Sequence, residues 1–324
     1  MNEMKFTVLG PRGSGKTTLL SCIYEEFAKE LPGKFSPADT HTADTLKSAY
    51  KSLRREADKP GTREFESPVE ATHHLREYPF TIKGKRAKLN VRFYDFPGSW
   101  IDPGNVNNER VINIVKSSAV IIVAINTPYL MEFGGRYVDD EWCSVDEIEW
   151  AVKRGLEGSE SQRLILFVPI KCERWLETHE ERENLIRAVK NAFHDTLTLS
   201  YNPLYRGKLA MALLPVQTAG NVSFRRFKFD SDGRITSEVY RKNPGKRFRP
   251  VNVDQPMRYL MSFILNQFAE NSSRFRKFMR LIFFRGDLSE VAREIRRGMK
   301  SDYDLPSGFE IFCGRDLIGF PSHN

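Results

Sequence analysis

The sequence feature that most constrains this chain is the segment GPRGSGKT at residues 10–17, which fits the pattern G-x-x-x-x-G-K-[ST] without exception. A short apolar stretch at residues 4–9 precedes it, and residues 15–31 have apolar side chains at helical spacing. A glycine-rich turn between a strand and a helix points backbone N–H groups, and the positive end of the helix dipole, toward a bound phosphate. The segment therefore predicts a site for a nucleoside triphosphate.

The residue types within this loop predict particular contacts. Lys16 is expected to reach the β- and γ-phosphates, and the hydroxyl of Thr17 is placed to bind Mg²⁺. Arg12 has three interpretations: it leans over the γ-phosphate, it reaches the nucleotide of a partner across a dimer, or it is a solvated loop arginine. The predicted phosphate-binding residues are Gly10, Pro11, Arg12, Gly13, Ser14, Gly15, Lys16, Thr17 and Thr18.

Apolar patterning along the chain predicts alternating strands and helices. Residues 119–125 and 164–168 are uniformly apolar, as expected for strands of a parallel sheet that are buried on both faces. Residues 77–82 and 89–94 alternate in polarity around a short basic turn, which predicts a hairpin. A further strand is expected at 209–216, and helices at 43–57, 145–156, 180–197 and 255–269. This order predicts a three-layer α/β domain whose sheet is mostly parallel, with one antiparallel edge strand.

A second signal is the segment FYDFPG at residues 93–98, at the end of a predicted strand. Asp95 can hold the Mg²⁺ shell, and the backbone N–H of Gly98 can reach a γ-phosphate. With this pair the sequence resembles the P-loop GTPase superfamily, in its translation-factor-related branch, over residues 4–220. The resemblance implies that the loop after Gly98 is a switch that moves when the γ-phosphate leaves.

The resemblance also implies a threonine in an earlier loop that closes over Mg²⁺. Thr62 is the candidate, and Thr72 is the alternative. The implied metal ligands are thus Thr17, Asp95 and Thr62, and the implied catalytic residues are Lys16, Thr62 and Arg12. Many members place a glutamine directly after the glycine of the D-x-x-G segment, where this chain has Ser99-Trp100. Intrinsic hydrolysis is therefore expected to be slow, or to be completed by another group.

Two further loops resemble the guanine-binding loops of that superfamily. In the segment PIKCE at residues 169–173, Lys171 can lay its stem along the base and Glu173 can accept hydrogen bonds from the guanine ring. Ile170 stands where the superfamily has asparagine and cannot make its hydrogen bonds. In the later turn, Thr218 and Ala219 resemble the residues that offer a backbone N–H to the guanine carbonyl. GTP or GDP, with Mg²⁺, is the expected ligand.

Three functions are compatible with these motifs. The first is a GTPase switch with low intrinsic activity, whose switch loops are read by a protein partner or a second copy. The second is a nucleotide-binding scaffold with little hydrolysis, and the third is an ATP-using P-loop NTPase. Trp100 has three possible roles: it covers the nucleotide, it docks a partner, or it is buried beneath the switch.

The net charge of +8 is unevenly distributed, since residues 221–300 contain 19 Lys/Arg against 8 Asp/Glu. Residues 275–284 interleave aromatic and basic side chains, which indicates either a helix packed on the domain or contact with an anionic surface or acidic partner. No nucleic-acid motif accompanies this charge. Residues 250–267 resemble bacterial double-GTPase proteins of predicted conflict systems, in which one GTPase is expected to work beside a second.

The expected division is a GTPase-like domain at residues 1–220, a basic β-hairpin insertion at 221–250, a helix completing the domain at 251–270, and a basic helical extension at 271–324. The N-terminus has no signal peptide, and no run of 18 apolar residues is present. Four cysteines without a C-x-x-C pair indicate neither a zinc site nor a disulfide framework. These features predict a cytoplasmic protein.

Overall fold

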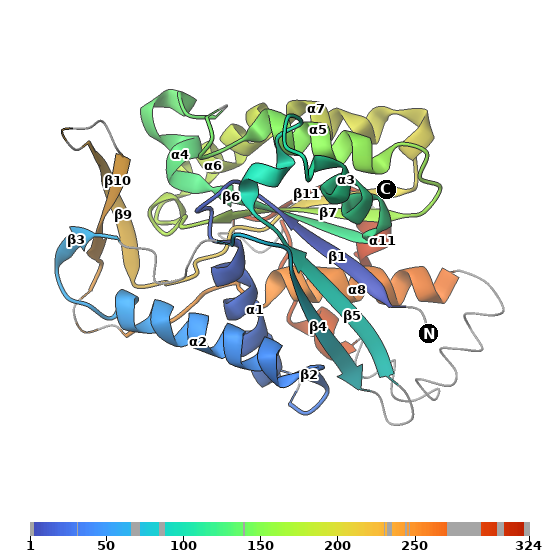
Figure 1. Cartoon of the computed structure of the whole chain (residues 1–324), viewed down its shortest axis with the longest axis horizontal. Helices are drawn as coiled ribbons and strands as arrows, with labels where there is room; N and C mark the ends of the chain where they lie inside the picture. The colour runs from blue at the N-terminus through green and yellow to red at the C-terminus, as the bar shows by residue number, and fades with distance from the viewer. Residues whose placement is uncertain are drawn as a thin grey trace.

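The computed structural model describes residues 3–30, 32–65, 72–83, 88–138, 140–229, 231, 235–243, 245, 247–270, 293–302 and 308–320. Its centre is an eight-stranded sheet in the order β11-β8-β7-β6-β1-β5-β4-β2, with helices on both faces (Figure 1). Five strands are parallel to one another: β5 (Lys88–Asp95), β1 (Met4–Leu9), β6 (Val120–Asn126), β7 (Arg163–Ile170) and β8 (Leu209–Leu213). The three-layer α/β fold with a mostly parallel sheet is therefore confirmed.

The edges of the sheet are more elaborate than the sequence patterning predicts. The expected antiparallel strand is β4 (Arg76–Lys83), which pairs with β5. It is not the outermost strand, because β2 (Phe35–Pro37) pairs antiparallel outside it. At the opposite edge, β11 (Glu310–Cys313) pairs antiparallel with β8. Strands of three or four residues are too short for a period of two to be recognised, so both escaped prediction.

The uniform apolarity of the central strands follows from burial on both faces. Along β6, Val120, Ile122 and Ala124 pack into one hydrophobic cluster, whereas Ile121 and Val123 pack into the other. Helices α1 (Lys16–Glu30), α2 (Thr40–Ala57) and α8 (Gln255–Glu270) cover the first face. Helices α3 (Asn108–Ser117), α5 (Val145–Leu156), α6 (His179–Ala192) and α7 (His194–Thr198) cover the second (Figure 1).

One helical prediction needs adjustment. The single helix expected at 180–197 is interrupted at Phe193, where α6 ends. The buried ring of Phe193 packs with its centre 5.1 Å from that of Phe167.

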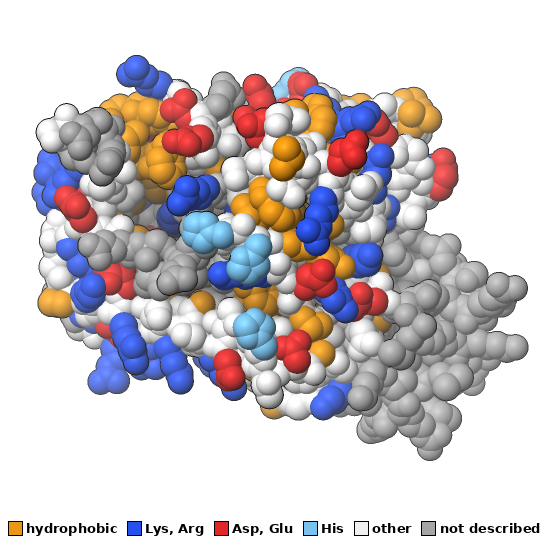
Figure 2. Space-filling view, in the orientation of Figure 1, with side chains coloured by type: hydrophobic (Ala, Val, Ile, Leu, Met, Phe, Trp, Pro, Cys, Tyr) orange, Lys and Arg blue, Asp and Glu red, His pale blue; other side chains and the backbone are white. Residues whose placement is uncertain are grey.

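The outer face of α2 is strongly basic, with Lys47, Lys51 and Arg54 exposed, and Lys and Arg side chains gather along it in Figure 2. Short helical segments join the main elements: η1 (Gly98–Ile101), α4 (Thr127–Met131), η2 (Glu132–Gly135), η3 (Arg174–Leu176), η4 (Leu199–Tyr201), η5 (Pro203–Tyr205) and α11 (Arg315–Ile318).

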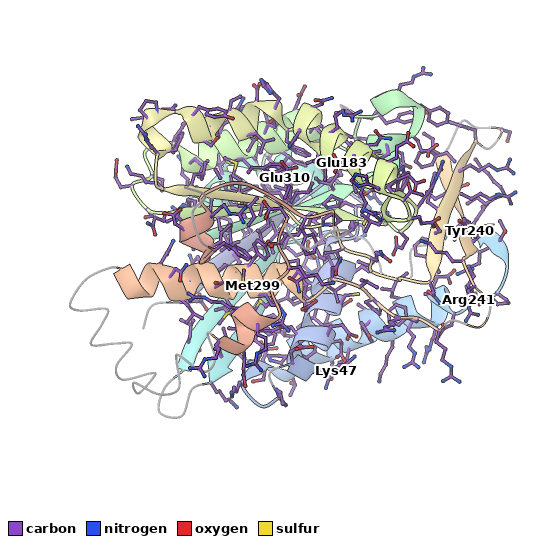
Figure 3. The ribbon with its side chains drawn as sticks, turned by 180° about the vertical axis from the view of Figure 1, so that it is seen from behind. Lys47, Glu183, Tyr240, Arg241, Met299 and Glu310 are labelled. Atoms are coloured by element: carbon purple, nitrogen blue, oxygen red, sulfur yellow. The ribbon has the colours of Figure 1, made fainter. Side chains whose placement is uncertain are left out.

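A second, three-stranded sheet stands beside the main one, at the left of Figure 1. It consists of β3 (Thr62–Glu64), β10 (Ile235–Arg241) and β9 (Val222–Phe229), in that order. Strands β9 and β10 form the antiparallel pair predicted after Gly220. Phe224 stacks on Trp175, and Phe227 contacts Tyr129, so aromatic packing joins the small sheet to the main domain. Figure 3 shows β10 from behind, with Tyr240 and Arg241 labelled.

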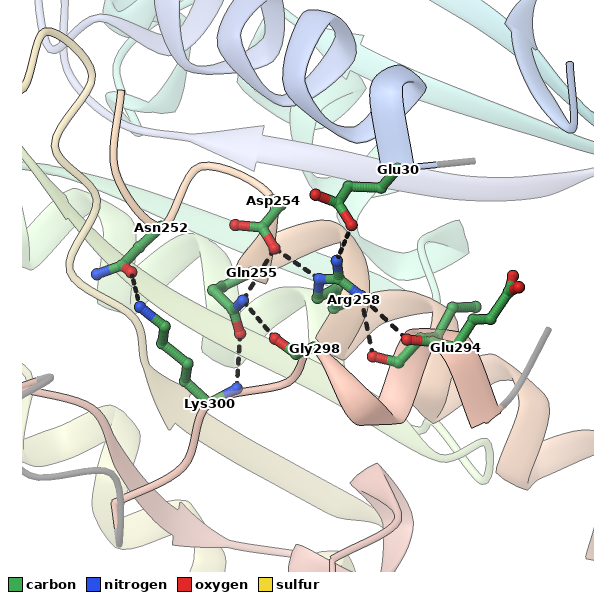
Figure 4. Close-up of polar contacts among 9 residues, drawn as sticks. Glu30, Asn252, Asp254, Gln255, Arg258, Glu294, Gly298 and Lys300 are labelled. Atoms are coloured by element: carbon green, nitrogen blue, oxygen red, sulfur yellow. Dashed lines mark hydrogen bonds and ion pairs between the residues drawn. The ribbon is translucent and has the colours of Figure 1, made fainter. Parts of the chain in front are cut away.

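The segment before β11 is attached to α8 through a buried arginine (Figure 4). Arg258 is 6% exposed, and its guanidinium donates to Asp254 and Glu30 and to the backbone carbonyl of Glu294 at 3.3 Å. Four neighbouring contacts extend this network through Gln255, Gly298, Lys300 and Asn252. Residues 293–300 are thereby held against α8.

The aromatic and basic stretch at residues 275–284 lies outside the described residues. Within the described ranges, none of the helices is both long and apolar enough to cross a bilayer.

Candidate functional site

The candidate site lies at the edge of the sheet where the parallel strands end. Strand β1 leads directly into the GPRGSGKT loop, and α1 begins at its lysine. On either side of β1, β5 ends at Asp95 and β6 ends at Asn126, and β7 ends next to β6 at Ile170. The carboxyl ends of parallel strands are where ligands bind in open α/β sheets. Topology alone therefore brings these four chain segments together.

The backbone of the loop depends on glycine at its first position. Gly10 has φ = 153°, and a Cβ there would lie 2.7 Å from the carbonyl oxygen of Ala124 on β6. The loop consequently passes close against the neighbouring strand. The Ser14 hydroxyl donates to the Pro11 carbonyl at 2.9 Å, which holds the turn from inside.

Lys16 lies inside this turn rather than in solvent. Its side chain is 6% exposed, and its Nζ donates to the carbonyl oxygens of Gly10 at 2.8 Å and Pro11 at 3.0 Å. Burial lowers the pKa of the ammonium, and the negative charge of Asp95 acts in the opposite direction. A buried ammonium that donates to carbonyl oxygens and forms no ion pair within the described ranges is suited to binding an anion such as a phosphate.

Beside Lys16, two hydroxyls and one carboxylate meet. Thr17 Oγ1 donates to Asp95 Oδ2 at 2.6 Å, and Thr72 Oγ1 lies 3.3 Å from both of these atoms. Asp95 is fully buried, and its Oδ1 has no hydrogen-bond partner among the described residues. Hydroxyl and carboxylate oxygens are ligands that Mg²⁺ accepts, usually one or two from protein together with phosphate oxygens and water. These residues fit a Mg²⁺ site of that kind.

No larger acidic or thiolate cluster competes for this role, since the described ranges contain no group of three His, Cys, Asp or Glu side chains placed to hold a metal.

The structure brings Thr72, and not Thr62, to this cluster. Thr62 is exposed on β3, where it pairs with Tyr240 of β10. The pairing joins residues far apart in sequence, so no local pattern could have placed Thr62 in a sheet. The alternative threonine, Thr72, is the one beside Thr17 and Asp95.

The D-x-x-G segment packs directly on the phosphate loop. A Cβ at Gly98 would overlap the backbone of Pro11 and Arg12, so only glycine fits there. Trp100 is half-buried against the second hydrophobic cluster, with the Arg110 guanidinium 5.9 Å from its ring centre. Arg12 is exposed and has no hydrogen bond or ion pair within the described part of the chain.

Next to the phosphate loop is a pocket of about 240 Å³. Lys171 crosses it, donating from Nζ to the Gly13 carbonyl at 2.9 Å, and burial lowers the pKa of Lys171 to about 8. Glu173, 3% exposed, accepts at Oε1 from the backbone N–H groups of Ala219 at 3.1 Å and Gly220 at 3.2 Å. The two loops that resemble guanine-binding loops are thus held together by the Glu173 carboxylate. Burial raises the pKa of this group.

The remaining predicted residues also line this pocket. Thr18, Thr218 and Ala219 contribute to its wall, and Ile170 does so where the superfamily has asparagine. A Cβ at Gly15 would lie 3.0 Å from Ile170 Cδ1, so this isoleucine packs apolar surface against the phosphate loop.

The opposite wall was not predicted from the sequence. It is supplied by the small sheet and by aromatic residues of three other segments: Phe65, Tyr129, Trp142, Val222, Phe224, Ile235, Thr236, Ser237 and Val239. Alternating apolar residues in β9 indicate that one face of this strand is buried. They do not indicate that this face lies against the pocket, because that depends on contacts between distant segments. Asn126, at the end of β6, also lines the pocket and was not recognised.

Comparison with known proteins gives one family and two structural likenesses. The family model described as Double-GTPase 2 matches residues 6–197. The signal recognition particle receptor in the SRb-GTP/SRX complex from Chaetomium thermophilum is 13% identical, with 68% of this chain and 93% of that chain covered and a TM-score of 0.36. The GTPase-like domain of Ski7 from S. cerevisiae, bound to GTP, is 12% identical, with 67% and 43% covered and a TM-score of 0.35. No curated protein matches the sequence.

Proposed function

Because the chain belongs to the Double-GTPase 2 family, whose model spans residues 6–197, we propose that it is a Mg²⁺-dependent GTP-binding switch with slow intrinsic hydrolysis. The observation that carries the proposal is the group formed by Thr17, Thr72 and the fully buried Asp95 beside the phosphate loop. Asp95 Oδ1 has no hydrogen-bond partner among the described residues, and a Mg²⁺ ion bound with the nucleotide would compensate the charge of this carboxylate.

In the proposed mechanism, the backbone N–H groups of the loop and the Lys16 ammonium hold the phosphates. Lys16 exchanges its hydrogen bonds with Gly10 and Pro11 for contacts with phosphate oxygens. Thr17, Thr72 and Asp95 would hold Mg²⁺, which when bound would neutralise part of the charge on the transferring phosphoryl group. The backbone N–H of Gly98 donates a hydrogen bond to the γ-phosphate. When the γ-phosphate leaves, the segment that begins at Gly98 is released.

Slow hydrolysis follows from the residues after Gly98. Orientation of the attacking water is the step for which related enzymes use a glutamine. Ser99 is exposed and Trp100 is half-buried against the domain, and neither side chain can orient a water as glutamine does. Arg12 is exposed at the mouth of the loop and is available to a partner's nucleotide or to the γ-phosphate. A second copy of the chain or another protein would then complete hydrolysis.

Guanine selectivity is proposed to come from Lys171 and Glu173. The hydrogen bond of Lys171 to Gly13 draws its methylene stem across the pocket, where a purine ring can pack on it. Glu173 uses Oε1 to hold the turn at Ala219 and Gly220, which places its carboxylate at the wall of the pocket. A carboxylate oxygen at this position can accept from the ring N–H and amine of guanine, which adenine lacks in that arrangement.

The test is to measure the affinities of the purified protein for GTP, GDP and ATP, with and without Mg²⁺, together with single-turnover phosphate release. We expect a clear preference for guanine nucleotides, stronger with Mg²⁺, and release over many minutes. Preference for ATP would overturn the proposal in favour of an ATP-using NTPase. Guanine binding without any phosphate release would support the second candidate, a nucleotide-binding scaffold, which the Ser99-Trp100 pair favours.

The Mg²⁺ site makes a separate prediction that distinguishes two threonines. Thr72→Val should weaken Mg²⁺-dependent GTP binding about tenfold, since it removes a hydroxyl beside Thr17 and Asp95. Thr62→Val is the matched control, because it changes the same residue type in the small sheet, opposite Tyr240. Titration of Mg²⁺ at fixed GTP measures both. Equal effects of the two substitutions, or a larger effect of Thr62→Val, would contradict the assignment of Thr72.

A further inference from the structure

Asn126 occupies a special position beside the isoleucine that replaces the superfamily's asparagine. It is the last residue of β6, and in the parallel pairing with β7 its direct partner is Ile170. Directly paired residues of neighbouring strands project from the same face of a sheet, because side chains alternate with a period of two. The amide missing at position 170 is therefore present one strand away, on the same face.

The side chain of Asn126 is buried and incompletely satisfied. It is 1% exposed and lines the pocket that also contains Gly15, Lys171 and Glu173. Its Oδ1 has no hydrogen-bond partner among the described residues. Buried side-chain amides are nearly always hydrogen-bonded, so an unpaired one at a pocket wall indicates a ligand or water as its partner. The two ends of an amide exchange on rotation by half a turn, so this end can accept or donate.

The hydrogen-bond donors and acceptors of the pocket residues indicate which edge of a purine ring Asn126 would contact. Glu173 is an acceptor and matches the N1–H and exocyclic amine of guanine. The adjoining major-groove edge of guanine has two acceptors, O6 and N7, whereas adenine has an amine donor in place of O6. Lys171 is committed to Gly13. Among the other polar side chains of the pocket wall, Asn126 is the amide that pairs directly with position 170, and its Oδ1 is buried without a partner among the described residues.

We propose that Asn126 is a specificity-determining residue, which donates from its amide to the O6/N7 edge of the guanine ring and does so in place of the asparagine absent at position 170. This inference rests on the proposed function, since it assumes that guanine nucleotides occupy the pocket. It accounts for the isoleucine at 170, which can pack against Gly15 because its polar role has moved to the neighbouring strand.

The test compares Asn126→Leu with the wild-type protein for affinity toward GTP and ATP. Leucine keeps the size and apolar contacts but lacks the amide, so we expect GTP affinity to fall about tenfold and ATP affinity to change less than about twofold. Asn126→Asp provides a second variant of equal size that accepts but does not donate. It should lose GTP affinity and gain relative affinity for ATP, whose amine would face the carboxylate.

Thr127→Val is the matched control. Thr127 is the next residue, fully buried, with an Oγ1 that also lacks a partner among the described residues, but it does not line the pocket. Its substitution should leave both nucleotide affinities unchanged, and thermal melting of each apo variant checks that it folds.

The outcomes separate this inference from the proposal that it extends. If the wild-type protein shows no guanine preference, the proposed function fails whatever the variants do. If the wild-type protein prefers GTP and Asn126→Leu keeps the same ratio of GTP to ATP affinity, the inference alone is overturned. Equal losses for GTP and ATP would also overturn it, because Asn126 would then support only the phosphate loop.

Discussion

Lys16→Ala is expected to weaken the binding of GTP and GDP by about 30-fold or more. The Lys16 ammonium is buried in the phosphate loop, and its partners are the carbonyl oxygens of Gly10 and Pro11. In a site shielded from water, removal of one member of a hydrogen-bonded charge pair costs about 2–5 kcal/mol of binding free energy. Each 1.4 kcal/mol is about a factor of ten in affinity, which gives the expected loss.

The same substitution should not weaken the fold of the nucleotide-free protein. Burial lowers the pKa of Lys16, so the folded chain binds its proton less tightly than the unfolded chain. A lysine with a lowered pKa reduces stability at neutral pH, and this cost disappears as the pH rises toward the unfolded value. Alanine removes this cost together with the hydrogen bonds to Gly10 and Pro11, so the melting temperature without nucleotide should change little.

Thermal melting with and without GTP·Mg²⁺ measures both effects, since a ligand that binds only the folded state raises the melting temperature. The wild-type protein should be stabilised by the nucleotide and Lys16→Ala should not. Lys29→Ala is the matched control, because Lys29 lies on the same helix but is exposed, pairs with Glu26 and lies over the ring of Tyr50, away from the phosphate loop. Undiminished stabilisation of the Lys16 variant would mean that the nucleotide is not held by this loop.

The phosphate half of the site could be predicted from sequence because each of its parts is local. The residues of the loop, from Gly10 to Thr17, are contiguous and are held by bonds within the loop, such as that from Ser14 to Pro11. Asp95 ends an apolar strand, and a strand end next to β1 is placed by the sheet topology. A motif whose geometry is determined by its own backbone needs little information from the rest of the fold.

The base half could be predicted only in part, because its geometry depends on contacts between distant segments. Glu173 was recognised as an acceptor, but its bonds to Ala219 and Gly220 join loops 46 and 47 residues apart. The small sheet that closes the pocket joins β3 to β10, and no local pattern indicates that pairing. For the same reason the sequence favours Thr62 over Thr72 as the metal ligand and does not indicate Asn126.

Gly98→Ala is expected to lower the rate of GTP hydrolysis about 100-fold while GDP affinity stays within about threefold. The D-x-x-G segment touches the phosphate loop at Pro11 and Arg12, and a methyl group at position 98 would overlap the backbone of both. The backbone at Pro11 and Arg12 cannot rotate away as a side chain can, so the segment must retreat by roughly 1 Å. A misplacement of that size can cost about 100-fold in rate. GDP lacks the γ-phosphate that this segment is proposed to sense, so its binding should be spared.

Gly104→Ala is the control for this prediction, because it adds the same methyl group a few residues further along. Its nearest neighbour would be the side-chain oxygen of Asp102 at 3.3 Å, which can move aside. Single-turnover phosphate release and GDP affinity should both be close to wild type for Gly104→Ala. If Gly98→Ala hydrolyses GTP at the wild-type rate, the close contact between the two loops is not part of the active arrangement. If it loses GDP as well as hydrolysis, the contact instead supports the phosphate loop itself, and γ-phosphate sensing by Gly98 must be abandoned.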